Sequence, residues 1–151
     1  MLCEHFWKGL KMGFDKFGIK NFVSETKAEE FVSLLEKGLV STTQCLQCGH
    51  ILFPPKMDCP RCGSSSVKWV ELEGSGTLEA FTRVFYGPAG FENRVPYSLG
   101  VVRFHDDVRV FGQIAADIPV DEIHVGMTLK VRSIRLDSDK LSYVFEKTFQ
   151  Q

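Results

Sequence analysis

The chain has 151 residues, 44% of them hydrophobic, which is enough for one medium-sized domain or two small ones. It has no uninterrupted apolar run of about 18 residues, and its charged first residues do not form a secretory signal, so a cytoplasmic protein with no membrane span is expected. The net charge is −1, but residues 71–151 carry nine basic and twelve acidic side chains, which argues against nucleic acid as a partner.

Residues 1–24 place apolar side chains at the spacing of an amphipathic helix, although three glycines weaken it, each by about 1 kcal/mol relative to alanine. Large side chains gather on one side of this helix: Phe6, Trp7, Leu10, Phe14 and Phe17. Two interpretations stay open. The helix packs on the rest of this chain, or these side chains form an interface with a partner protein, with Trp7 as the main anchor.

A second helix is predicted over Ala28–Lys37. Ser24 or Thr26 can accept backbone N–H groups at its start, acidic residues occupy its first turn, and Gly38 can end it. Its apolar face consists of Phe31, Leu34 and Leu35. Together with the first segment, this helix makes residues 1–44 a predicted N-terminal helical region.

Two Cys-x-x-Cys pairs follow, and they are the strongest chemical signal in the sequence. The four cysteines are Cys45, Cys48, Cys59 and Cys62, with ten residues between the pairs. The thiolates of one pair can reach the same ion, and Gly49 and Gly63 permit the tight backbone turn that follows each pair. Four thiolates suit tetrahedral zinc, so residues 45–70 are predicted to form a zinc ribbon.

The predicted zinc is expected to be structural, with one ion per chain, because a closed set of four sulfurs leaves no position for water or substrate. Paired disulfides or a metal-free remnant of such a site are the alternatives, but disulfides need an oxidising compartment, which nothing in the sequence indicates. The segment is too short to bury a core of its own, so metal binding is expected to hold it together.

From residue 67 onward the sequence becomes rich in Val, Ile, Phe and Thr and is divided by turn residues. The predicted strands are Val67–Leu72, Thr77–Tyr86, Tyr97–Phe104, Val108–Ala116, Thr128–Leu136 and Leu141–Phe149. Residues 105–107 and 137–139 are predicted hairpin turns, and residues 118–125 a short helical turn. Five main strands in this order, with a small helix between the third and fourth, predict an OB-fold barrel over residues 71–151.

Phenylalanine is abundant, at 13 copies, and supplies bulk for the core of a small barrel. The predicted core side chains are Phe81, Phe104, Phe111, Phe145 and Phe149. The longest irregular piece of the barrel region is the loop 87–96, and loops of this kind usually carry binding residues.

The sequence offers no recognisable catalytic pair of a nucleophile beside a base. Four of the five cysteines are assigned to metal, and the fifth, Cys3, lies at an end that is expected to fray. The histidines show no triad spacing; they are His5, His50, His105 and His124. The chain alone is therefore predicted to be non-catalytic.

The run FPPKMDCPRCGSSSVKWVELEGSGTLEAFTRV and the later segments VPYSLGVVRF, VFGQI and HVGMTLKV resemble the zinc-ribbon/OB-fold acyl-CoA-associated family over about residues 28–149. The resemblance implies a mainly β fold with N-terminal helices, a rubredoxin-like zinc ribbon and a C-terminal five-stranded OB barrel. It also implies an accessory subunit of a thiolase-like enzyme acting on acyl-CoA, either degradative, as in β-oxidation, or biosynthetic.

Coenzyme A is a candidate ligand, because its adenine ring can stack on aromatic side chains and its phosphates can bind arginine. The candidate contacts bracket the long loop: Phe85, Tyr86, Phe91, Arg94 and Tyr97. The alternative places Phe85 and Tyr97 in the barrel core and Arg94 on the solvated surface. Two other functions stay open for the chain: a single-stranded nucleic-acid-binding protein and a self-sufficient thioesterase or acyltransferase.

Overall fold

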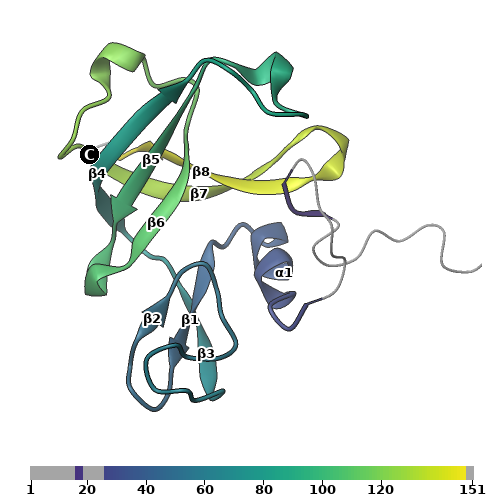
Figure 1. Cartoon of the computed structure of the whole chain (residues 1–151), viewed down its shortest axis with the longest axis vertical. Coiled ribbons are helices and arrows are strands. Elements are labelled where there is room, and N and C mark those ends of the chain that lie inside the picture. Colours follow the sequence, from purple (N-terminus) through teal and green to yellow (C-terminus); the bar gives the residue numbers. More distant parts are fainter. Residues whose placement is uncertain (1–15, 19–25, 149–151) are drawn as a thin grey trace, which may run out of the picture.

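The computed structural model describes residues 16–18 and 26–148, which form two β-structures joined by a short linker (Figure 1). A closed five-stranded barrel occupies the upper part of the view, and a three-stranded sheet that carries the cysteines lies below it. Helix α1 (Glu30–Glu36) lies beside the small sheet and contacts the barrel strands β7 (Thr128–Arg135) and β8 (Leu141–Lys147). The predicted mainly β architecture is confirmed.

Helix α1 coincides with the centre of the predicted second helix and is shorter at both ends. The hydroxyl oxygen of Thr26 accepts the backbone N–H of Ala28 at 3.0 Å in the turn before the helix, and Gly38, with φ of +89°, follows its end. The buried side chains are Phe31, Val32 and Leu35, so Val32 takes the place predicted for Leu34. Within the described residues, no helix has the length and apolar character needed to span a bilayer.

The small sheet contains β1 (Ser41–Cys45), β2 (Ile51–Leu52) and β3 (Val67–Glu71), with β1 in the centre and antiparallel to both neighbours. Strand β3 was predicted, whereas β1 falls in the region predicted to be helical. The sheet begins four residues before the predicted ribbon boundary at residue 45, because the run Ser-Thr-Thr-Gln lacks the apolar pattern by which strands are recognised.

Two threonines of β1 are fully buried, and their hydroxyl groups have backbone partners. Thr42 donates to the carbonyl of Leu52 on β2. Thr43 donates to the carbonyl of Lys56 at 2.8 Å and accepts the N–H of the same residue at 3.0 Å. A buried hydroxyl is tolerated when its hydrogen bonds are made, so these contacts explain how a polar strand occupies the middle of the sheet.

The barrel strands are β4 (Ser75–Val84), β5 (Tyr97–Arg103), β6 (Arg109–Ile114), β7 and β8. They follow the order β4-β5-β6-β8-β7, and the pairing of β7 with β4 closes the ring. Neighbours are antiparallel except for β6 and β8, which run parallel. This order and closure confirm the predicted OB-type barrel.

Short 3₁₀ turns occupy the connections of the barrel. The turns η3 (His105–Asp107) and η5 (Asp137–Asp139) stand where hairpin turns were predicted, and the last aspartate of each has a left-handed φ near +60°. The turn η4 (Val120–Glu122) is the predicted helical turn between β6 and β7. The turn η2 (Glu92–Arg94), in the long loop between β4 and β5, was not predicted.

The barrel interior is filled by side chains that alternate along the strands, among them Leu78, Val102, Val110, Ile114, Leu129 and Phe145. Phe104 and Phe145 are buried as predicted. The prediction was wrong for Phe81 and Phe111, whose exposed fractions are 40% and 58%. Since successive residues of a strand face opposite sides, the burial of Val110 sends Phe111 outward. Phe149 lies outside the described residues.

An aromatic cluster joins the helix, the ribbon and the barrel. Phe31 of α1, Phe53 of the loop after β2 and Tyr143 of β8 contact one another edge to face, with ring centroids 5.7 to 6.4 Å apart. The Tyr143 hydroxyl donates to the carbonyl of Phe111 at 2.8 Å, and burial raises the pKa of Tyr143 to about 12. The phenol therefore stays neutral at physiological pH and remains a hydrogen-bond donor.

Replacing Phe53 with alanine is expected to lower the free energy of unfolding by about 3 kcal/mol, because the change removes a ring that fills the space between α1 and β8. Chemical denaturation in excess zinc measures the effect. Phe85→Ala is the matched control, since that ring is 63% exposed and its loss is expected to change stability by less than about 0.5 kcal/mol. Equal losses in the two variants would contradict the role given to the cluster.

Candidate metal centre

Two backbone turns present the four cysteines. Cys45 is the last residue of β1, and its carbonyl accepts the N–H of Gly49 at 3.0 Å. In the second turn the carbonyl of Cys59 accepts the N–H of Gly63 at 2.8 Å. The glycines have φ of +72° and +74°, with open space where a Cβ would stand. The backbone conformation, and not crowding, therefore favours glycine at both predicted positions.

The four sulfur atoms converge on one point. The Sγ atoms of Cys45 and Cys62 are 3.5 Å apart, those of Cys48 and Cys59 are 3.6 Å apart, and all four lie within 4.8 Å of one another. Tetrahedral zinc with Zn–S bonds of about 2.3 Å places its sulfurs about 3.8 Å apart, so the donor set suits structural zinc. The four thiols are free, and their separations exceed the roughly 2.05 Å of a disulfide bond.

The thiols of the cluster differ in acidity. The backbone N–H of Cys48 lowers the pKa of Cys45 to about 6. For Cys62, the backbone N–H of Ser64 lowers the pKa, but desolvation and the neighbouring sulfurs of the cluster raise it to about 12. The Cys45 thiol thus ionises readily, whereas the Cys62 thiol resists ionisation because negative charge accumulates among the sulfurs. A divalent cation at the centre offsets that repulsion, which is the chemical reason for expecting a metal here.

The predicted coenzyme A contacts lie on and beside the loop between β4 and β5. The side chains of Phe85 and Tyr86 are 63% and 92% exposed, so Phe85 is not a core residue. Phe91 and Tyr97 lie together, with ring centroids 5.8 Å apart. The loop therefore presents two solvent-exposed rings and one packed aromatic pair.

Arg94, the predicted phosphate contact, connects two loops at the same end of the barrel. Its Nη2 atom lies 3.4 Å from Oδ2 of Asp137, in the turn between β7 and β8. Both side chains are more than a third exposed, and an exposed pair of this kind contributes at most about 1 kcal/mol. A phosphate can therefore compete with Asp137 for the guanidinium group.

Of the residues predicted at a partner interface, Phe17 is the one within the described part of the chain. Its ring contacts Phe31 at 5.6 Å between centroids, and its backbone forms a bridge with Leu141 of β8. Phe17 is half-buried against the hydrophobic cluster around α1. The other four lie outside the described residues: Phe6, Trp7, Leu10 and Phe14.

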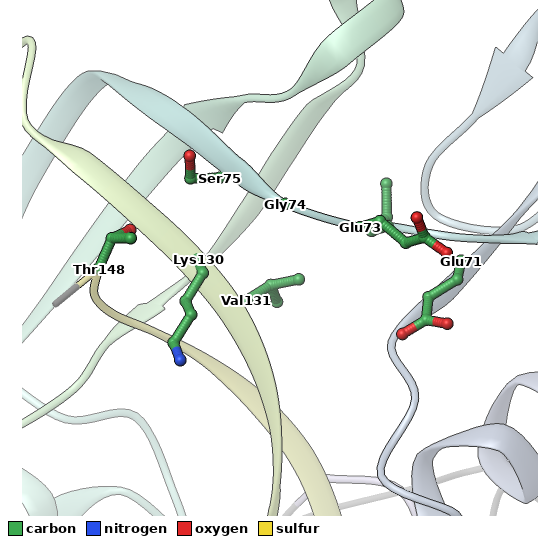
Figure 2. Close-up of a pocket in the computed structure, with 8 residues that line it drawn as sticks. Glu71, Glu73, Gly74, Ser75, Lys130, Val131 and Thr148 are labelled. Atoms are coloured by element: carbon green, nitrogen blue, oxygen red, sulfur yellow. The ribbon is translucent and has the colours of Figure 1, made fainter. Parts of the chain in front are cut away.

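A cavity of about 380 Å³ lies where the linker between the ribbon and the barrel passes β7 (Figure 2). Glu71 and Glu73 lie on one side of it, and Lys130 and Thr148 on the other. Its lining supplies carboxylates, hydroxyls and one amine, but neither cysteine nor histidine. The cavity therefore does not offer the cysteine and histidine pair on which thiolase-type acyl transfer depends.

The histidines of the described region occupy turns. His105 is exposed in η3, and Nδ1 of His124 lies 2.9 Å from the carbonyl of Glu122. The carbonyl of His50 accepts the N–H of Cys45 at 2.9 Å and so helps to shape the first cysteine turn. These are local structural contacts, and His5 lies outside the described residues.

Two family profiles match adjoining stretches of the chain. The profile described as "ChsH2, rubredoxin-like zinc ribbon domain" covers residues 41–68, and "ChsH2, C-terminal OB-fold domain" covers residues 69–133. The first match starts at the first residue of β1, and the second includes the barrel strands from β4 into β7. The boundary between the two profiles falls within β3, a few residues before the linker that joins the two β-structures.

Two relatives have names that refer to a scaffold protein and to a subunit of an enzyme. A "DUF35 domain-containing scaffold protein" of Pyrococcus furiosus is 36% identical over 96 residues, which cover 62% of this chain and 70% of that protein. The "Benzoylsuccinyl-CoA thiolase subunit BbsA" of Thauera aromatica is 30% identical over 107 residues, covering 69% and 73%. A solved structure of the "Ltp2-ChsH2(DUF35) aldolase" has a TM-score of 0.68 at 23% identity, covers 82% of this chain and 97% of that one, and confirms the fold.

Cys48→Ser is expected to reduce the zinc content well below one ion per chain and to unfold the ribbon, because the metal supplies on the order of 10 kcal/mol to small modules of this kind. Elemental analysis of protein purified without chelator measures the metal, and circular dichroism follows the fold. Cys3→Ser, at the cysteine outside both pairs, is the control and is expected to keep one zinc. Full zinc occupancy in the Cys48 variant would rule out the proposed ligand set.

Proposed function

This chain belongs to the DUF35 family, with a ChsH2-type zinc ribbon followed by an OB-fold domain, and we propose that it is a non-catalytic accessory subunit of a thiolase-type acyl-CoA complex. Its role is to hold the catalytic subunit in its assembled form. The observation that carries the proposal is the use of the four described cysteines as a closed metal site.

The proposed separation into a catalytic and an accessory subunit follows from the chemistry of acyl transfer. A thiolase-type enzyme needs a cysteine nucleophile and a base, whereas sulfurs bound to tetrahedral zinc are not free and leave no open coordination position. The reacting groups must then come from another chain, and relatives named as a thiolase subunit and a scaffold protein suit this arrangement. A degradative β-oxidation thiolase and a biosynthetic acyltransferase both accommodate such a subunit. The cytoplasm is the compartment that keeps the thiolates reduced.

The experiment is affinity purification of the tagged full chain from its native host, followed by identification of the retained proteins and an acyl-CoA cleavage assay. We expect a thiolase-like subunit to co-purify and the complex to cleave acetoacetyl-CoA or a related thioester. The purified chain alone is expected to show no turnover. Turnover by the chain alone, lost in Cys3→Ala, would replace the proposal with a self-sufficient enzyme.

The same purification tests the N-terminal segment, which we propose as part of the partner interface. Trp7→Ala is expected to weaken the complex by about 2 kcal/mol, since buried tryptophans often dominate interfaces. The melting temperature and zinc content of the isolated chain are expected to stay unchanged. A lower melting temperature with full recovery of the partner would assign Trp7 to the packing of this chain.

Coenzyme A contact is a further part of the proposed function. Tyr86 and Phe85 expose rings on which adenine can stack, and Arg94 stands between two loops at the end of the barrel where OB folds commonly bind ligands. The long loop therefore combines a stacking surface with a cation for phosphate. In the complex, this loop forms one wall of the coenzyme A entrance.

Tyr86→Ala is expected to weaken coenzyme A binding by the assembled complex about tenfold, because stacking of a base on an aromatic ring contributes about 1–3 kcal/mol. Tyr86→Phe keeps the ring and is expected to bind normally. Isothermal titration with coenzyme A measures both variants. Unchanged affinity in the alanine variant would remove Tyr86 from the coenzyme A site.

A further inference from the structure

Three neighbouring barrel strands carry an apolar patch on their outer surface, bordered by polar and charged side chains. In β5 the alternate residues Ser98, Gly100 and Val102 are buried, so Leu99 and Val101 point outward. The strand register extends these positions into two adjacent rows: Ala80–Val101–Phe111 and Thr82–Leu99–Gln113. We call the patch made by Ala80, Thr82, Leu99, Val101 and Phe111 the outer face.

The outer face departs from the usual pattern of an antiparallel sheet, in which the side away from the core is polar. Phe111 is its largest side chain and is 58% exposed. The backbone beneath that ring is firmly held, because the Phe111 carbonyl accepts the Tyr143 hydroxyl and the preceding Val110 is fully buried. A large aromatic ring presented on a rigid strand is the kind of anchor that protein interfaces use.

The charges along one edge of the outer face neutralise each other. Glu79 pairs with Arg103 at 2.7 Å and with Arg109 at 2.8 Å, and Arg109 also pairs with Asp107 at 3.0 Å. Two guanidinium groups are thus matched by two carboxylates. Because nucleic acids gain affinity by neutralisation of their phosphates with available cations, this edge favours an uncharged protein surface over a polyanion.

The other edge of the outer face adjoins the long loop. Tyr97 continues the outward row of β5, and its ring contacts Phe91 in the loop between β4 and β5. A protein seated on the outer face therefore lies next to the residues proposed to contact coenzyme A. This position is the one required of a catalytic subunit that takes coenzyme A thioesters.

We propose that the outer face, centred on Phe111, is the surface on which the thiolase-type catalytic subunit docks through a complementary apolar patch. This inference rests on the proposed function and adds the surface that carries it. The Phe111 ring enters a pocket of the catalytic subunit, Leu99 and Val101 of β5 lie beside it, and the Glu79 network remains at the rim.

The test uses the full chain and the thiolase-like subunit identified by the affinity purification. Phe111→Glu places a charge at the centre of the outer face and is expected to weaken binding at least tenfold by isothermal titration. Val125→Glu is the matched control, because Val125 is 60% exposed in the segment between β6 and β7 and does not belong to the outer face. Its affinity is expected to equal that of the unmodified chain. Zinc content and melting temperature verify that both variants are folded.

The other possible results of this experiment would overturn the inference in different ways. Normal binding by Phe111→Glu overturns the docking surface and leaves the proposed accessory role standing. Failure of the unmodified chain to bind a thiolase-like subunit overturns both. A homodimer of this chain that dissociates in Phe111→Glu, or nanomolar single-stranded DNA binding that the variant loses, assigns the outer face to a second copy or to nucleic acid and overturns the inference.

Discussion

Repulsion among four converging thiolates is the constraint on which the rest of this structure depends. The small sheet has little core of its own beyond Cys45, Leu52 and Cys59, so its shape relies on a cation that lets the sulfurs stay together. Once the ribbon is formed, its loop after β2 is positioned to carry Phe53 to Tyr143 of the barrel. The metal centre thereby orients one β-structure against the other through the loop after β2.

The predictions made from the sequence were most accurate where a single physical requirement determines the local structure. The cysteine spacing and the glycine after each pair follow directly from tetrahedral thiolate geometry, and the barrel strands follow from runs of β-branched and aromatic residues between turns. Strand β1 was not predicted, because its buried threonines are polar. Their hydrogen-bond partners, Leu52 and Lys56, come close only when the chain is folded. The outward position of Phe111 was not predicted, because Val110 and Phe111 are both apolar. The alternation of apolar and polar residues therefore does not determine which of the two side chains faces the core.

The two candidate binding surfaces of the barrel, the outer face and the long loop, differ because charged side chains are distributed unevenly over the barrel. On the outer side of β4–β6, Arg103 and Arg109 are tied to carboxylates, and the surface beside them carries the apolar outer face. At the loop end, Arg94 pairs with the exposed carboxylate of Asp137, and the same loop carries the solvent-exposed rings of Phe85 and Tyr86. The first arrangement suits contact with protein, and the second suits a small anionic ligand with an aromatic base. One barrel can thus present separate surfaces to the proposed partner subunit and to the proposed coenzyme A ligand.

The connection between Phe53 and Tyr143 has a consequence for the order of events during synthesis on the ribosome. The ribbon sheet is complete once Glu71 has been made, so the nascent chain can acquire its metal before the barrel strands are synthesised. The barrel closes only after β8, the last strand, pairs with β6 and β7. Because Tyr143 belongs to that strand, docking of the finished ribbon waits for the synthesis of β8, and the same late step completes both the barrel and the junction between the two β-structures.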